Sequence, residues 1–229
     1  MKVIFCVPTN TKPYQPCLDS LKASIPLIQA AGWEEGMVSE IGCPYISAAR
    51  ATMLRKALDA KADVIVFIDH DLSWDAEDLL TLIETKGDVV AGTYRFKREE
   101  IEYMGLPLSD IDGDVRGFKD GSILAHSIPA GFLKITKNAV NRFIEAYPEL
   151  TYGDKFSPCV DLFSHGAHKG VWYGEDYAFS RNWRDLGGEI KIVPNLNINH
   201  HDSAGIEYKG NYHEFLMTCP GGINDPHKA

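Results

Sequence analysis

The chain has 229 residues, of which 45% are hydrophobic, and this is enough to bury the core of one globular domain. A formal net charge of −9 argues against a broad basic surface for nucleic acids, because such surfaces gather lysine and arginine. The five cysteines form no CxxC pair and no segment is apolar over the width of a bilayer, so we expect a cytoplasmic protein without a disulfide framework, thiolate zinc site or transmembrane segment.

Strand and helix patterns alternate through the first half of the chain. The apolar spacing predicts strands over 2–7, 36–41, 63–68 and 88–91, and helices between them over 17–32, 46–61 and 75–85. This alternation is typical of a mostly parallel sheet covered by helices, so the predicted fold class is α/β in a single domain.

A long segment without clear periodicity follows the fourth predicted strand. Residues 92–121 are rich in charge, glycine and proline, and we expect residues 93–120 to lie over a bound ligand as a lid. Beyond it, the spacing predicts two strands within 122–136, helices over 137–147 and 174–188, and a strand over 189–194. The tail after Tyr212 has little pattern.

Two carboxylates follow the most hydrophobic predicted strand, in the stretch VIVFIDHDLSW (64–74). Ligands of α/β sheets collect outside the carboxyl ends of the strands, and side chains two residues apart on a strand point the same way. Asp69 and Asp71 can therefore converge on one point. Carboxylates this close repel unless a cation lies between them, so the pair predicts a site for Mn²⁺ or Mg²⁺. The alternative is that Asp71 or Ser73 caps the helix that begins near residue 75.

Seven segments of the chain together resemble one enzyme family. They are VPTN (7–10), SAARATML (47–54), VIVFIDHDLSW (64–74), VVAGTYRFKRE (89–99), PAGFLKIT (129–136), YGEDYAFSRNWRDLGGEI (173–190) and NHH (199–201). In this order they resemble the GT-A glycosyltransferases, which transfer a sugar from a nucleoside-diphosphate donor and carry a D-x-D motif. The resemblance implies a GT-A-like domain over 1–212, with a nucleotide-binding half at 1–92, an acceptor half at 121–212 and a C-terminal tail at 213–229.

The resemblance also implies which residues hold the nucleotide. Pro8, Thr9 and Asn10 form the first βα turn, which would hold the base and ribose of the donor. Arg50 would reach the nucleotide or its phosphates, as arginine does for anions. The alternative for Arg50 is an ordinary solvated helix residue.

The metal ligands follow from the same resemblance. Asp69 and Asp71 would bind the ion that bridges the diphosphate, with Asp71 as the direct ligand and Asp69 alternatively on the ribose and a metal-bound water. A late histidine completes the shell in this family. We prefer His201 to His200, because His201 lies at the loop end of the run 190–201 and neighbouring strand residues face opposite sides.

An acidic pair at the start of the helix near residue 175 is implied to lie beside the acceptor. In inverting members of the family this carboxylate removes the proton of the acceptor hydroxyl, and we prefer Asp176 for that role, with Glu175 second. In retaining members the same position only holds the acceptor or the sugar. The alternative is that both carboxylates simply open the helix, where the helix dipole favours acidic side chains.

These features predict metal-dependent transfer of a sugar from a nucleoside-diphosphate sugar to a hydroxyl of a saccharide, a glycoconjugate or a modified base. A nucleic-acid acceptor is not favoured by the acidic composition, although Arg95, Lys97 and Arg98 form a basic cluster that suits an anionic acceptor or the donor phosphates. Two alternatives stay open. They are a metal-dependent nucleotidyltransferase or phosphohydrolase, since acidic pairs and histidines also build hydrolytic sites, and a nucleotide-sugar binder without catalysis.

Overall fold

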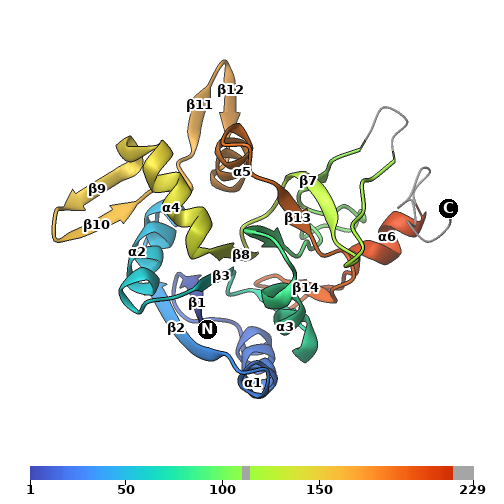
Figure 1. Cartoon of the computed structure of the whole chain (residues 1–229). Coiled ribbons are helices and arrows are strands. Elements are labelled where there is room, and N and C mark those ends of the chain that lie inside the picture. The colour runs from blue at the N-terminus through green and yellow to red at the C-terminus, as the bar shows by residue number, and fades with distance from the viewer. Residues whose placement is uncertain (110–113, 219–229) are drawn as a thin grey trace.

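The computed structural model describes residues 1–109 and 114–218, and within them eight strands form one central sheet of order β2-β1-β3-β8-β5-β13-β7-β6 (Figure 1). Its strands are β1 Lys2–Thr9, β2 Glu34–Ile41, β3 Val64–Ile68, β5 Val89–Ala91, β6 Leu106–Pro107, β7 Ile123–Ser127, β8 Phe132–Thr136 and β13 Ile190–Ile192. Strand β1 is parallel to β2 and β3, and β13 is parallel to β5. The sheet is mixed because β8 runs antiparallel to β3 and β5, and β7 runs antiparallel to β13. The predicted single-domain α/β fold class is confirmed.

Helices cover both faces of this sheet, which explains the continuous apolar run of β3. The helices are α1 Gln15–Ala30, α2 Ile46–Asp59, α3 Ala76–Glu84, α4 Lys137–Ala146, α5 Glu175–Asp185 and α6 Tyr212–Thr218. Ile65 and Phe67 of β3 pack in the cluster that contains side chains of α2, α4 and α5, whereas Val64, Val66 and Ile68 pack in the cluster with α1 and α3. Since strand side chains alternate between faces, every residue of β3 is buried.

A second, three-stranded sheet brings the late histidines to the acidic stretch. It has the order β15-β14-β4, with β4 at Leu72–Trp74, β14 at Ile198–His201 and β15 at Glu207–Tyr208. Strand β14 pairs antiparallel with β4, and the His201 N–H donates to the Asp71 carbonyl at 2.8 Å. The turn after β3, which carries Asp71, and strand β14, which carries both histidines, therefore lie side by side at one edge of the fold.

The segment that the sequence predicts as a lid contains some regular pairing. Strand β6 pairs with β7, Arg95 bridges to Tyr103, and Ser109 bridges to Val115. Residues 110–113 of this prediction lie outside the described residues. Closure over a ligand stays a prediction.

Three other features lie outside the sequence expectations. Hairpins β9–β10 (Thr151–Asp154, Ser157–Val160) and β11–β12 (Gly166–His168, Val171–Tyr173) project from the body of the molecule (Figure 1). The expected tail begins inside α6, whose Tyr212 and Leu216 belong to the core, and its residues 219–229 lie outside the described residues.

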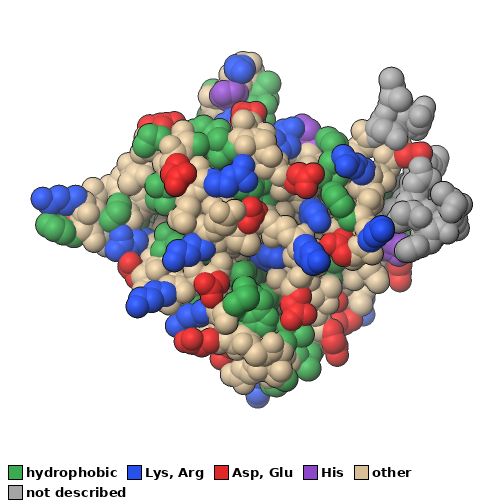
Figure 2. Space-filling view, in the orientation of Figure 1, with side chains coloured by type: hydrophobic (Ala, Val, Ile, Leu, Met, Phe, Trp, Pro, Cys, Tyr) green, Lys and Arg blue, Asp and Glu red, His purple; other side chains and the backbone are tan. Residues whose placement is uncertain are grey.

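The molecular surface agrees with the mixed, acidic composition. For the described residues of one face, Figure 2 shows acidic and basic side chains intermixed rather than a broad basic patch. Among the helices of residues 1–109 and 114–218, none combines the length and apolar character that crossing a membrane requires.

Candidate functional site

A pocket of about 330 Å³ opens at the carboxyl ends of β1 and β3. Its lining includes seven residues that the sequence singles out, namely Pro8, Thr9, Asn10, Arg50, Asp69, Asp71 and Glu175. They come from β1 and its following turn, from α2, from the turn after β3 and from the first residue of α5. The fold therefore gathers segments far apart in the chain at the edge where α/β proteins bind ligands.

The nucleotide side of the pocket follows directly from the end of β1. Pro8 and Thr9 are buried and Asn10 is exposed. Within the described residues, the buried Thr9 hydroxyl has no hydrogen-bond partner, although it lies in a polar pocket. A buried hydroxyl without a partner costs free energy, which suits a position that a ligand would satisfy.

Arg50 joins two of the candidate carboxylates. Its side chain is 3% exposed, with Nη2 3.0 Å from Asp69 Oδ1 and Nη1 2.6 Å from Glu175 Oε1. Its guanidinium carbon lies 5.3 Å from the centre of the Phe163 ring. The alternative of a solvated helix residue does not hold, and the two carboxylates offset the cost of burying its charge.

Asp69 is also held from the opposite side, by Tyr94. The Tyr94 hydroxyl donates to Asp69 Oδ2 at 3.3 Å, and burial raises the pKa of that hydroxyl well above its usual value, so it stays protonated. The Asp69 N–H donates to the carbonyl of Gly131 at 2.8 Å. Both oxygens of Asp69 are therefore fixed, one by Arg50 and one by Tyr94.

Gly131 is a residue whose role the sequence motif PAGFLKIT (129–136) did not reveal. A Cβ atom at this position would overlap the Tyr94 hydroxyl and the Asp69 carboxylate. Glycine is required here because the backbone approaches the acidic site too closely for a side chain.

We expect Gly131→Ala to displace the Asp69 carboxylate and to destabilise the protein by about 1–3 kcal/mol, as overpacking of a filled site does. Denaturant unfolding measures the change. In the Gly131→Ala background, Tyr94→Phe removes the nearest of the three colliding atoms, so the double variant should recover part of the loss. Unchanged stability in the single variant would contradict the packing described.

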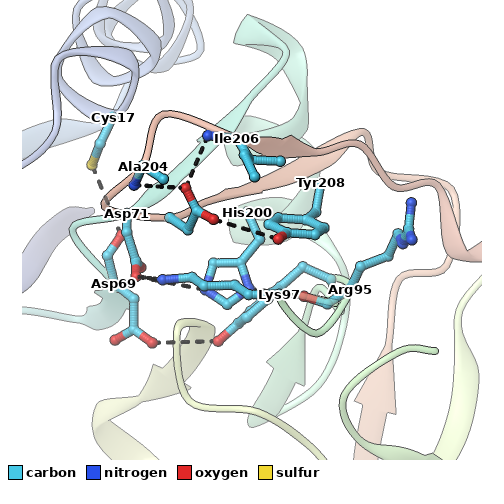
Figure 3. A network of polar contacts seen from close by, with 11 residues as sticks. Cys17, Asp69, Asp71, Arg95, Lys97, His200, Ala204, Ile206 and Tyr208 are labelled. Atoms are coloured by element: carbon cyan, nitrogen blue, oxygen red, sulfur yellow. Dashed lines mark hydrogen bonds and ion pairs between the residues drawn. The ribbon is translucent and has the colours of Figure 1, made fainter. Parts of the chain in front are cut away.

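Asp71 lies beside two nitrogen groups (Figure 3). Its Oδ2 accepts a hydrogen bond from Lys97 Nζ and lies 3.6 Å from His200 Nε2. Burial would raise the pKa of Asp71, but the adjacent His200 imidazole and the hydrogen bond from Lys97 hold that pKa well below its usual range. Asp71 is therefore an ionised carboxylate, and the alternative that it caps α3 is not seen, since the N-cap residue of that helix is Asp75.

The two late histidines face opposite sides of β14. The Nδ1 atom of His200 lies 2.8 Å from the Arg95 carbonyl, which can only accept, so this nitrogen carries the proton and Nε2 faces Asp71. His201 Nε2 lies 2.8 Å from Ser73 Oγ, and His201 lines a different cavity from that of Asp71. The register of β14 on β4 thus favours His200, not the His201 that the sequence preferred, as the histidine nearest the acidic pair.

The acidic pair of α5 is divided between two environments. Glu175 is bound to Arg50, whereas Asp176 lies beside the pocket and accepts the Tyr177 N–H at 2.8 Å. Burial and the neighbouring charge of Glu175 raise the pKa of Asp176 to about 6. Asp176 lies in the first turn of α5, as the alternative of a helix-opening carboxylate expects. Its raised pKa also makes it a stronger base than an ordinary aspartate.

The ligand chemistry of this corner suits a divalent ion, but the side chains do not yet converge as a metal shell. Asp69, Asp71 and His200 offer two carboxylates and an imidazole, which Mn²⁺ accepts. Among the described residues, however, no three His, Cys, Asp or Glu side chains are grouped closely enough to hold a metal ion. Lys97 occupies the Asp71 oxygen instead, so a bound ion requires Lys97 to move.

No protein-family model matches the chain, and no curated protein matches it. Among solved structures, GalNAc-T7 with UDP, GalNAc and Mn²⁺ is 13% identical with a TM-score of 0.47, over 86% of this chain and 43% of that one. A Drosophila β-1,4-galactosyltransferase 7 in complex with manganese, UDP-Gal and xylobiose is 12% identical with a TM-score of 0.44, over 99% and 77%.

The structure is similar to those of glycosyltransferases. It is also similar to the inositol-1-phosphate CTP transferase of T. maritima, at 10% identity and a TM-score of 0.43, over 87% of this chain and 89% of that one. The chain spans less than half of the GalNAc-T7 chain that it matches.

Proposed function

We propose that the protein transfers a sugar from a nucleoside-diphosphate donor to an acceptor hydroxyl with the help of Mn²⁺ or Mg²⁺. The observation that carries this proposal is the pocket at the carboxyl ends of β1 and β3, in which Asp69 and Asp71 lie together. Such an edge is where α/β sheets hold nucleotides, and paired carboxylates there hold hard divalent ions.

The charge of the pocket supports the part of the proposal that concerns a cation. Glu40, Asp69, Asp71 and Glu175 line it, against a single lining arginine, Arg50. This negative lining would repel a bare diphosphate. A divalent ion between the carboxylates and the phosphates would attract both groups and so hold the diphosphate in the pocket. When bound, the ion would be held by Asp69, Asp71 and His200 and would stabilise negative charge on the departing nucleoside diphosphate.

The remaining tasks fall to side chains of the chain itself. Pro8, Thr9 and Asn10 would hold the base and ribose. Arg50 fixes the orientation of Asp69 and Glu175. Asp176, whose raised pKa suits a general base near neutral pH, would accept the proton of the acceptor hydroxyl.

Thermal unfolding with nucleoside diphosphates and Mn²⁺ tests the donor site. We expect little stabilisation by either alone and about 2.7 kcal/mol when both are present at 100 times the dissociation constant. Asp71→Asn should abolish this stabilisation without unfolding the protein, because it removes the direct ligand. Asp59→Asn, which affects only an exposed pair with Arg55, should leave it unchanged.

Three outcomes would count against the proposal. An undiminished shift in Asp71→Asn would show that Asp71 does not hold the ion. Consumption of a nucleoside triphosphate with a sugar phosphate, or release of phosphate alone, would instead support the nucleotidyltransferase or phosphohydrolase alternative. Binding of a nucleotide sugar without turnover under any acceptor would support a non-catalytic binder.

A further inference from the structure

Lys97 reaches the acidic pair from an exposed turn. Arg95 bridges to Tyr103 and the Phe96 N–H donates to the Glu102 carbonyl at 3.0 Å, so Lys97 follows directly on two paired residues at the start of the turn. The base of the turn is fixed to the site, because His200 donates to the Arg95 carbonyl. A lysine ammonium on a four-carbon stem can change partner while such a backbone stays in place.

The ammonium of Lys97 holds the oxygen that a metal ion would need. Lys97 Nζ and His200 Nε2 approach the same atom, Asp71 Oδ2 (Figure 3). The Asp71 side chain is only 15% exposed, so without a cation it would be a poorly solvated charge. In the structure, the Lys97 ammonium is the cation that stabilises the ionised Asp71 carboxylate. Ionisation of Asp71 therefore does not require a metal ion.

A divalent ion on Asp71 would displace this contact. Two cations cannot share one carboxylate oxygen without strong mutual repulsion, so the ion and the ammonium compete. Once displaced from Asp71, which lines the pocket, the Lys97 ammonium would be free to contact the phosphates that accompany the ion. Lysine binds phosphate as a mobile point charge.

We infer that Lys97 is a cationic placeholder, holding the metal position on Asp71 in the free protein and binding the donor diphosphate once the ion has replaced it. The diphosphate part of this inference rests on the proposed function. The placeholder part does not, because it concerns only Lys97 and Asp71. It follows that metal and diphosphate bind together more readily than either binds alone.

Mn²⁺ affinity, measured from the electron paramagnetic resonance of free Mn²⁺, tests the placeholder. Without nucleotide, Lys97→Met should bind Mn²⁺ about tenfold more tightly than the wild type, a common size for coupled binding events. At saturating Mn²⁺ the same variant should bind the tightest of UDP, GDP, ADP and CDP about tenfold more weakly. Lys2→Met is the matched control, because Lys2 pairs with Glu34 at the opposite end of β1 and its side chain is similarly exposed, at 28% against 31% for Lys97.

The outcomes separate this inference from the proposed function. Unchanged or weaker Mn²⁺ binding in Lys97→Met, and in Lys97→Gln as a second variant, overturns the placeholder. Unchanged nucleotide affinity overturns the diphosphate contact. If the wild type binds no Mn²⁺ with any nucleotide but Lys97→Met does, the placeholder stands and the metal-dependent function falls.

Discussion

Replacing Asp176 by asparagine is expected to lower the rate of sugar transfer by about 10²- to 10⁴-fold, the usual cost of removing a general base. Donor binding should change little, because Asp176 lies beside the pocket and not among its lining residues. Steady-state kinetics with varied donor, together with donor affinity from calorimetry, separate these effects. Glu175→Gln is the comparison variant, since glutamine can still accept a hydrogen bond from Arg50.

The pH dependence gives Asp176 a signature of its own. With a pKa of about 6, the Asp176 carboxyl is protonated below that pH and cannot accept a proton, so kcat/KM should fall as pH drops through about 6. Asp176→Asn should lose this acidic limb. If Asp176→Asn has a normal transfer rate and only a lower thermal stability, Asp176 serves only to start the helix. If Glu175→Gln loses more transfer rate than Asp176→Asn, Glu175 is the general base.

Arg50→Met is expected to destabilise the protein by about 3 kcal/mol. Removing one partner of a buried ion pair costs about 3–5 kcal/mol because a charge is left unpaired, and the lower end applies since Asp69 and Glu175 are 28% and 25% exposed. Methionine keeps an apolar side chain in the buried position and removes the guanidinium, which lies over the Phe163 ring and pairs with both carboxylates. Urea unfolding measures the difference.

Arg55, five residues after Arg50 on α2, is the control position for the loss of a buried arginine. Arg55 pairs with Asp59 at the surface, where such pairs contribute about 0–1 kcal/mol, so Arg55→Met should cost far less. Adding Glu175→Gln to Arg50→Met removes one stranded carboxylate and should recover part of the loss. Equal effects of Arg50→Met and Arg55→Met would contradict the buried network.

Local patterns were sufficient for the framework of the fold. The apolar period predicted the strand that became β3 and the helices that became α1–α5, because these elements are long or bury one side against the sheet. The position of Asp69 and Asp71 directly after the most hydrophobic strand predicted a ligand-binding edge, and both line the pocket, but they lie in the turn after β3 and not on the strand, so the strand period of two does not align them. The antiparallel insertion of β8 between β3 and β5 was not predicted, since strand order depends on pairing and not on local spacing.

The parts of the site that the sequence did not reveal all depend on contacts between distant residues. Arg50 and Glu175 meet across 125 positions, and Lys97 meets Asp71 from a turn with no pattern. The side on which His200 lies is set by the register of β14 on β4. Gly131 matters only because Tyr94 and Asp69 lie against its backbone. The short hairpins carry too few residues for a period to show.

The pairing of β4 with β14 has a consequence for the order in which the molecule is made. Asp71 leaves the ribosome before β14, the strand that pairs with β4 and carries His200, because β14 lies more than a hundred positions later in the chain. A nascent chain can build the first core strands well before that partner emerges. The acidic corner is therefore completed only once β14 has emerged, and a nascent chain that has not reached β14 has the donor turn without His200.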